Sequence, residues 1–136
     1  MEKLKELVER KGAKTRPANA GSIQALEAKL GFGLSQEYKL YLSTFGVIVH
    51  GASEIYGLGV PDNYYLNVGN AHADLSRDPA YPANAVPVID VGDGQYYLYD
   101  NQAQQIILWA TPNGGIVRKL DASFESFLID QLFHGG

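Results

Sequence analysis

Residues 34–46, LSQEYKLYLSTFG, form the stretch that decides the fold. Ser35 is a favourable helix N-cap, and Glu37 follows in the first turn, where its charge meets the positive end of the helix dipole. Apolar residues then recur at the spacing of one helix face, namely Tyr38, Tyr41, Leu42 and Phe45. Gly46 supplies a stop. The pattern predicts a short one-sided helix that must bury its aromatic face against another element.

Two further helices are predicted before this one. Leu4, Leu7 and Val8 make one face of a helix that Gly12 closes, and residues 13–22 have loop composition. Ser22 is the expected N-cap of the second helix, and Gly31 is its expected end. Its apolar stripe consists of Ile23, Leu26 and Leu30. Three consecutive one-sided helices need a common apolar surface on which to pack.

The period of the sequence changes after residue 46. Short β-rich runs at residues 47–51 and 53–59 predict one or two strands, and a short helix is expected at residues 68–76. Residues 85–91 and 95–100 flank Gly92-Asp93-Gly94, a strong hairpin signal. Strands at 104–111 and 116–120 follow, and Asp121 or Ser123 is expected to cap a final helix.

This order of elements predicts the α+β class. We expect an antiparallel sheet of about four to six strands, flanked by N-terminal helices and a C-terminal helix. The length of 136 residues is that of one compact domain, so a single domain over residues 1–136 is expected.

Composition narrows the functional classes. The chain has no cysteine, which excludes disulfides, thiolate catalysis and cysteine-ligated zinc or iron–sulfur centres. No apolar run approaches the roughly 20 residues of a membrane span, and the first 12 residues carry charges of both signs. A cytoplasmic protein without membrane association is therefore predicted.

Charge is distributed unevenly along the chain. Residues 47–117 contain one Lys or Arg against seven Asp or Glu, a balance of −6, whereas residues 1–46 have a balance of +3. A long acidic region argues against direct nucleic-acid binding, which needs clustered positive charge. It suits a basic protein partner, and the alternative interpretation is simple solubility.

Residues with catalytic chemistry do not gather in the sequence. His50, His72 and His134 lie in separate regions and form no metal-binding spacing. Gly92-Asp93-Gly94 is not followed by the Gly-Lys-Ser/Thr of a phosphate loop and is better explained as a turn. We therefore predict no catalytic residues, no metal site, no cofactor and no enzymatic activity.

Tyrosines are the more informative feature of the acidic region. Tyrosine is enriched at protein interfaces because it buries a large area while keeping a polar tip. On a strand, Tyr97 and Tyr99 point to one face and Tyr96 to the other, so at least one face of the hairpin shows tyrosine. Half-buried core positions are the alternative for these rings. The predicted partner-binding residues are Glu54, Asp62, Tyr64, Asp93, Tyr96, Tyr99 and Asp100.

Residues 23–46, IQALEAKLGFGLSQEYKLYLSTFG, resemble the opening signature of the SUKH superfamily, the Smi/Knr-like domain. There a helix of the type I-x-x-L-E-x-x-L-G runs into L-P-x-x-Y/F, an aromatic helix and a terminal glycine. The matching positions are Ile23, Leu26, Glu27, Leu30, Gly31, Leu34, Tyr38, Leu42, Phe45 and Gly46. EIYGLG, VIDVGDGQYYLYD and SFESFL also look like the later parts of the family, so the resemblance covers about residues 22–130. Ser35 departs from the usual proline, and VIVHG replaces a polar glycine turn after Gly46.

The resemblance implies an α+β, non-enzymatic, protein-binding domain. Many bacterial members are immunity proteins that neutralise a cognate toxin, for example a nuclease, and a nuclease must be basic to hold its substrate. The resemblance therefore points to a basic toxin domain as partner. Eukaryotic relatives linked to cell-wall signalling imply the alternative, a regulatory adaptor that binds an endogenous protein.

Overall fold

The computed structural model describes residues 1–134, so residues 135 and 136 of the predicted domain lie outside the described part. The helices are α1 (Glu2–Lys11), α2 (Ala20–Leu30), α3 (Gln36–Thr44), α4 (Val68–Leu75) and α5 (Phe124–Phe133). The strands are β1 (Lys14–Thr15), β2 (Ile48–His50), β3 (Ser53–Ile55), β4 (Ala85–Gly92), β5 (Gln95–Asp100), β6 (Gln105–Ala110) and β7 (Gly115–Leu120). The predicted α+β class, with helices before and after the strands, is confirmed.

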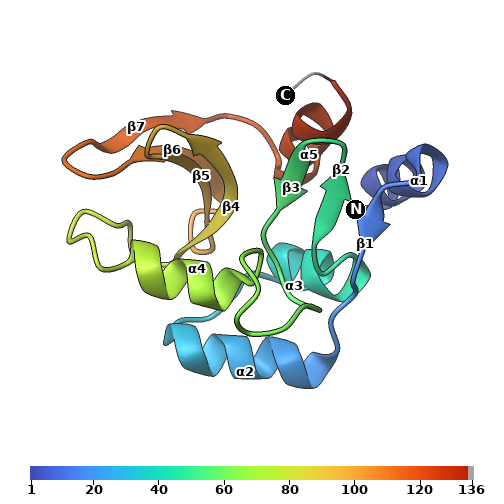
Figure 1. Ribbon diagram of the computed structural model, residues 1–136, viewed down its shortest axis with the longest axis horizontal. Coiled ribbons are helices and arrows are strands. Elements are labelled where there is room, and N and C mark those ends of the chain that lie inside the picture. Colours follow the sequence, from blue (N-terminus) through green and yellow to red (C-terminus); the bar gives the residue numbers. More distant parts are fainter. Residues whose placement is uncertain (135–136) are drawn as a thin grey trace.

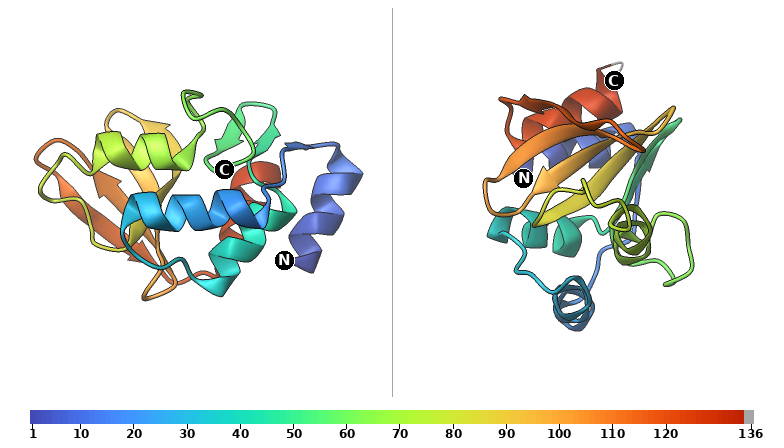
Figure 2. Two further views of the ribbon diagram at one scale, coloured as in Figure 1. Left: turned by 90° about the horizontal axis from the view of Figure 1, so that it is seen from below. Right: turned by 90° about the vertical axis from the view of Figure 1, so that its left-hand side faces the viewer.

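The strands are divided between two antiparallel sheets (Figure 1). One has three strands in the order β1-β2-β3, and the other has four in the order β4-β5-β6-β7. The predicted hairpin joins β4 to β5, with Asp93 in a left-handed conformation at a φ of 54°. Figure 2 shows α2 and α4 next to each other on one side of the molecule, where the two helices are in contact.

Both faces of the four-stranded sheet are covered. On one face, Tyr99 of β5 stacks on Phe124 of α5 with ring centroids 4.6 Å apart and on Tyr38 of α3 at 5.7 Å. On the other face, Trp109 packs with Leu75 of α4 and with a group of neighbours, namely Ala85, Leu98, Ile107, Tyr81 and Tyr96. The aromatic side of α3 is thus buried against the sheet and α5, as its spacing predicts.

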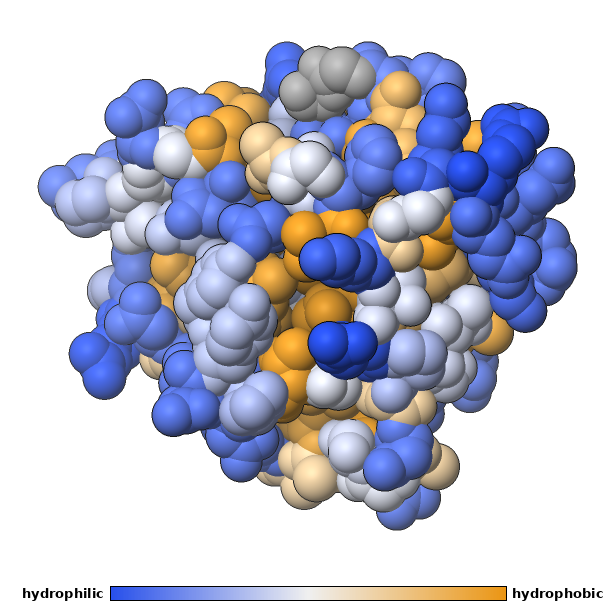
Figure 3. All heavy atoms as spheres, turned by 45° about the vertical axis from the view of Figure 1, so that its right-hand side comes forward, coloured by the Kyte–Doolittle hydropathy of each residue, from blue (hydrophilic) through white to orange (hydrophobic). Residues whose placement is uncertain are grey.

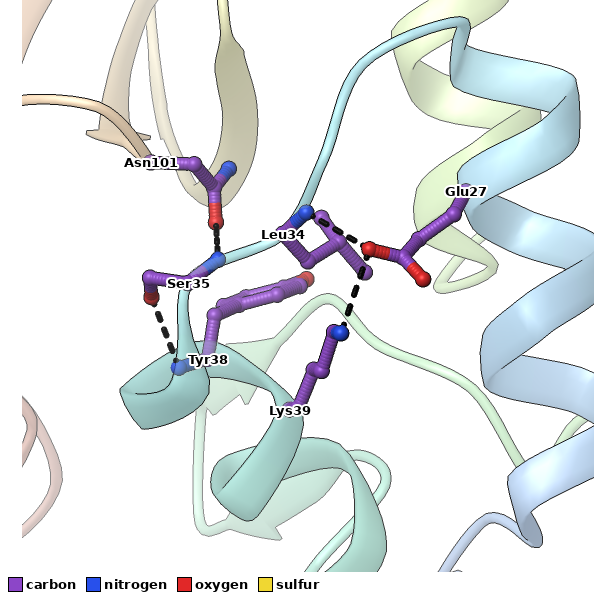
Figure 4. A network of polar contacts seen from close by, with 6 residues as sticks. All are labelled: Glu27, Leu34, Ser35, Tyr38, Lys39 and Asn101. Atoms are coloured by element: carbon purple, nitrogen blue, oxygen red, sulfur yellow. Dashed lines mark hydrogen bonds and ion pairs between the residues drawn. The ribbon is translucent and has the colours of Figure 1, made fainter.

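The start of α3 is fixed by polar contacts (Figure 4). The Oγ atom of Ser35 accepts the N–H of Tyr38 at 3.0 Å, which confirms Ser35 as the N-cap. Asn101, after β5, accepts the N–H of Ser35 at 2.9 Å. Glu27 of α2 accepts the N–H of Leu34 at 2.9 Å and forms an ion pair with Lys39 at 3.4 Å. These bonds hold α3 against both its preceding helix and the sheet.

Glycines allow three backbone segments to cross without intervening side chains. A Cβ atom on Gly57 would overlap the carbonyl oxygen of Gly46. A Cβ atom on Gly46 or Gly59 would overlap the carbonyl oxygen of Arg16, and both glycines have positive φ angles of 74° and 84°. Gly46 therefore does more than end a helix. Because it has no side chain, the backbone after α3 can lie in direct contact with the backbone at Arg16.

Two local predictions need correction. The N-cap of α2 is Asn19 rather than Ser22, because the Oδ1 atom of Asn19 accepts the N–H of Ser22 at 2.8 Å and the helix already begins at Ala20. The predicted loop at 13–22 also contains β1, whose Lys14 lies opposite Val49 of β2. A two-residue strand has no periodicity of its own, so only its pairing partner reveals it.

Candidate functional site

Tyr99 does not belong to a partner-binding surface, which corrects the sequence-based prediction. Its side chain is 0% exposed. Its hydroxyl donates to Oε1 of Glu37 at 2.9 Å and lies 2.8 Å from Oγ of Ser35. Burial raises the pKa of Tyr99 well above its ordinary value. The residue supports the start of α3 from inside the core because α5 covers this face of the hairpin.

Three of the predicted acidic positions lie apart from one another. Asp93 is in the turn at one end of β5, whereas Asp100 is the last residue of that strand. The Oδ1 atom of Asp100 accepts the N–H groups of Gln102 and Ala103 at 2.8 and 3.1 Å, which shapes the next turn. Asp62 lines a separate hollow of about 340 Å³ together with Lys29. These carboxylates do not form one surface.

Glu54, Tyr64 and Tyr96 do lie along connected hollows. A hollow of about 500 Å³, here named the β3–β4 groove, is lined by residues that include the acidic Glu54 and Asp90 and the tyrosines Tyr56, Tyr65 and Tyr97. Beyond Tyr56 and Tyr65, a second hollow of about 360 Å³ is lined by residues that include Asp74, Arg77 and Tyr96. The structure therefore brings Glu54 and Tyr96 to two ends of one tyrosine-rich depression.

The β3–β4 groove exists because the two sheets touch and then separate. The N–H of Tyr56, directly after β3, donates to the carbonyl of Val88 in β4 at 3.0 Å. Gln131 of α5 also lines the groove, and its carbonyl accepts a hydrogen bond from the Ser53 hydroxyl at 3.1 Å. The groove thus lies between two strand edges, with a helix contributing to its lining.

Negative charge dominates the surroundings of Tyr56. Burial, and after it the charges of Asp90, Glu54 and Asp74 together with the neighbouring Tyr96, raise the pKa of Tyr56 to about 12. The hydroxyl of Tyr65 donates to Oε2 of Glu54, and this hydrogen bond raises the pKa of Tyr65. No Lys or Arg of residues 1–134 lines the β3–β4 groove itself. The site is therefore suited to a cationic group.

A third hollow, of about 420 Å³, adjoins this region on the side of the three-stranded sheet. Val47, Val49 and Leu66 contribute apolar lining, and Lys14, Arg16, Glu54 and Tyr64 complete its sides together with Thr15, Val60 and Pro61. Figure 3 shows this side of the molecule, with apolar side chains at its centre and hydrophilic ones both across and around them. Glu54 lines both this hollow and the β3–β4 groove, so it stands between a basic and an acidic neighbourhood.

Five tyrosines and acidic residues of the depression are absent from the sequence-based prediction, namely Tyr56, Tyr65, Asp74, Asp90 and Tyr97. Their residue types are those that the prediction selected, and Tyr65 directly follows Tyr64. What the sequence lacks is the adjacency of β3 and β4, which brings residue 54 beside residue 90. Without that adjacency, all acidic residues of the middle region looked equivalent.

His50 and His72 pack against aromatic rings, whereas His134 is exposed. His72 lies between Phe32 and Tyr81, with ring centroids 5.7 and 5.3 Å away, and burial lowers its pKa. His50 contacts the ring of Phe133 at 5.0 Å. Within residues 1–134, no three His, Asp or Glu side chains are placed to hold a metal ion. The helices of this part are all too short or too polar to cross a membrane.

Comparison with known proteins identifies a family and a solved structure with a similar fold. A family model described as SUKH_5, SMI1-KNR4 cell-wall, matches residues 1–133. A crystal structure of a protein from Pseudomonas syringae pv. tomato has a TM-score of 0.75 and 15% sequence identity, covering 98% of this chain and 99% of that one. At this identity the likeness shows the fold alone. No curated protein matches the chain.

Proposed function

Since the chain belongs to the SMI1-KNR4 family, in the group described as SUKH_5, we propose that it is a non-enzymatic protein-binding domain that neutralises a cognate bacterial toxin. The partner is a basic toxin domain, for example a nuclease, and binding takes place in the cytoplasm without a cofactor. The observation that carries this proposal is the convergence of Glu54, Asp74 and Asp90 on one tyrosine-rich depression.

Charge complementarity explains why such a surface suits an immunity protein. An inhibitor must meet its toxin before the toxin meets its substrate, and opposite charges accelerate that encounter. Tyrosine rings then supply contact area at low entropic cost. Tyr64 and Tyr65, which are 41% and 56% exposed, pack against each other with tilted rings 4.7 Å between centroids and provide such contact area. The surface that we propose therefore centres on Glu54, Tyr64, Tyr65 and Tyr96.

A regulatory adaptor is the second candidate. The matching family model carries a cell-wall description, which favours an endogenous protein partner of that process. The same acidic depression would serve either role, because recognition of a basic surface does not depend on what the partner does. The two functions therefore differ in the partner's activity rather than in the site.

The test is to purify the chain from its native host, identify the co-eluting protein, and express that protein alone and together with this chain. If this chain is an immunity protein, the partner expressed alone should arrest growth, and co-expression with this chain should restore normal growth. A harmless partner that belongs to cell-wall synthesis would support the adaptor instead. If the purified chain forms no complex with any co-eluting protein when the two are recombined, both functions fail.

Charge reversal locates the surface once a partner is known. The variant Glu54→Lys/Asp90→Lys should slow association roughly tenfold and weaken its salt dependence, because electrostatic steering acts mainly on the association rate. The variant Glu6→Lys/Glu9→Lys makes the same change of net charge on exposed positions of α1 and is the matched control. Equal association rates for the two variants would exclude the depression as the binding surface.

A further inference from the structure

The outer edge of β3 faces the β3–β4 groove. In the β2–β3 hairpin, Ser53 lies opposite His50 across a two-residue turn, and Glu54 lies opposite Val49. Hydrogen-bonded and non-bonded pairs alternate in an antiparallel ladder, so the peptide groups of Glu54 point away from β2. Tyr56, two residues later, has the same orientation and donates its N–H to Val88 of β4. The main chain of Glu54 is therefore directed to the side on which an extended segment could lie.

The side chains around this edge define what such a segment should carry. Two acidic residues line the groove, Glu54 from β3 and Asp90 from β4, and the charges of both act on Tyr56. Tyr56 and Tyr65 lie beside them, whereas Tyr97, which also lines the space, points to the opposite face of the sheet from Asp90 and packs on Phe127. An aromatic face attracts a cation, and a carboxylate pairs best with a planar donor that offers two parallel N–H groups. Both requirements are met by a guanidinium group, whereas an ammonium group is compact and more strongly hydrated.

No Lys or Arg among the described residues 1–134 lines this space. Lys14 and Arg16 line the hollow on the other side of Glu54, and Arg77 lies 3.9 Å from Asp74 beyond Tyr56. None of these three residues lines the β3–β4 groove. At about 500 Å³ the groove also falls within the range of about 300–1,000 Å³ that is usual for a specific binding pocket.

We propose that the β3–β4 groove binds an arginine side chain carried by an extended segment of the protein partner. The guanidinium group lies beside the rings of Tyr56 and Tyr65 and pairs with Glu54 and Asp90, while the segment runs along the edge of β3. This inference rests on the proposed protein-binding function and names the chemical group that the partner presents. The inference thus gives this groove a specific role, beyond the general negative charge of residues 47–117.

The direct test uses short peptides and needs no knowledge of the partner. The probes are acetyl-Gly-Gly-Arg-Gly-Gly-amide and the same peptide with lysine or citrulline, titrated into the ¹⁵N-labelled chain. We expect the arginine peptide to shift the amide signals of residues 52–56 and 88–91 and to bind roughly tenfold more tightly than citrulline, which keeps the shape but lacks the charge. Equal binding of arginine and citrulline, or of arginine and lysine, would overturn the proposal.

Two double variants that each remove two negative charges, one pair in the groove and one pair on α1, provide the control. Glu54→Gln/Asp90→Asn keeps oxygen acceptors for Tyr65 and for the N–H of Gly92, whose bond to Asp90 measures 2.9 Å, so the fold should persist. This double variant should lose the arginine preference, whereas Glu6→Gln/Glu9→Gln should keep it. The dispersion of the amide spectrum verifies folding in each case. Peptide shifts that survive Glu54→Gln/Asp90→Asn, or that spread over α1, would contradict the assignment.

The outcomes distinguish this inference from the function on which it rests. If a toxin is neutralised equally well by Glu54→Gln/Asp90→Asn and by the unchanged chain, the arginine groove is wrong and the immunity function stands. If the arginine peptide occupies the groove but the natural partner proves harmless to the cell, the groove stands and the immunity function is wrong.

Discussion

Tyr38 and Tyr41 lie one turn apart on α3, and their rings are stacked with centroids 5.7 Å apart. Their hydroxyl groups differ in hydrogen bonding. The Tyr41 hydroxyl donates to the carbonyl of Tyr56 at 3.0 Å. The buried Tyr38 hydroxyl has no hydrogen-bond partner within residues 1–134. A buried polar group without a partner loses its bonds to water and gains nothing in return, so the two tyrosines should contribute differently to stability.

Removal of each hydroxyl tests this difference. Tyr38→Phe removes only an unsatisfied group and should leave the free energy of unfolding unchanged or raise it by up to about 1 kcal/mol. Tyr41→Phe leaves the carbonyl of Tyr56 without its donor and should lower the free energy by about 1–2 kcal/mol. Urea denaturation of the two variants measures both effects, and equal destabilisation would contradict the assignment of the Tyr38 hydroxyl.

The close approach of the backbone at Gly57 to the backbone at Gly46 leads to a second prediction. Gly57→Ala places a methyl group on the carbonyl oxygen of Gly46, which is backbone and cannot move aside. The variant should lose more than about 4 kcal/mol of stability or fail to fold. Gly33→Ala is the control, because its Cβ would have Glu27 Oε2 at 4.0 Å as its nearest neighbour. Thermal unfolding should place Gly33→Ala within a few degrees of the unchanged protein, and a similar melting temperature for Gly57→Ala would refute the crossing.

Tyr99→Phe distinguishes a core residue from an interface residue. The Tyr99 hydroxyl forms hydrogen bonds with Glu37 and Ser35 within the fold, so its loss should lower the free energy of unfolding by about 1 kcal/mol. Binding to the natural partner should be unaffected at a temperature where the variant is folded. Tyr65→Phe should instead weaken binding to the partner and leave the free energy of unfolding nearly unchanged, because Tyr65 is 56% exposed and lies at the β3–β4 groove. Calorimetric titration with the partner, combined with denaturation, separates the two residues.

Local signals account for the parts of the fold that the sequence predicts. Ser35 and Tyr38 are three residues apart, and the Asp93-Gly94 turn joins adjacent strands, so each structure is decided within a few residues. β1 was missed because its two residues acquire their conformation from β2, more than 30 residues later in the chain. The division of the strands into two sheets likewise depends on contacts that no local pattern encodes.

The candidate site shows the same limit. Alternation along β5 correctly separates Tyr96 from Tyr99, but it cannot say which face a helix covers, and both faces proved to be covered. Acidic composition pointed to residue types that line the groove, whereas the placement of Glu54 and Asp90 in one groove depends on the contact of β3 with β4 at Tyr56. Sequence therefore indicated the chemistry of the surface and left its position open.

The pH dependence of stability should report the contact between α2 and α3. The hydrogen bond from the N–H of Leu34, followed by the bond and charge of Lys39, lowers the pKa of Glu27. A carboxylate with a lowered folded-state pKa stabilises the fold at pH values above its ordinary pKa of about 4.3 and loses that contribution as the pH falls through the folded-state value. Stability should therefore decrease on acidification below about pH 5.

Glu27→Gln removes this charge while keeping an oxygen for Leu34. Because the contact is near the surface, the variant should lose no more than about 1 kcal/mol at pH 7, and its stability should fall less than that of the unchanged protein between about pH 5 and pH 3. Glu9→Gln on the exposed side of α1 is the matched control and should preserve the full acid dependence. Denaturation curves at several pH values measure the slopes. If Glu27→Gln retains the slope of Glu9→Gln, the carboxylate of Glu27 does not stabilise the junction of α2 and α3.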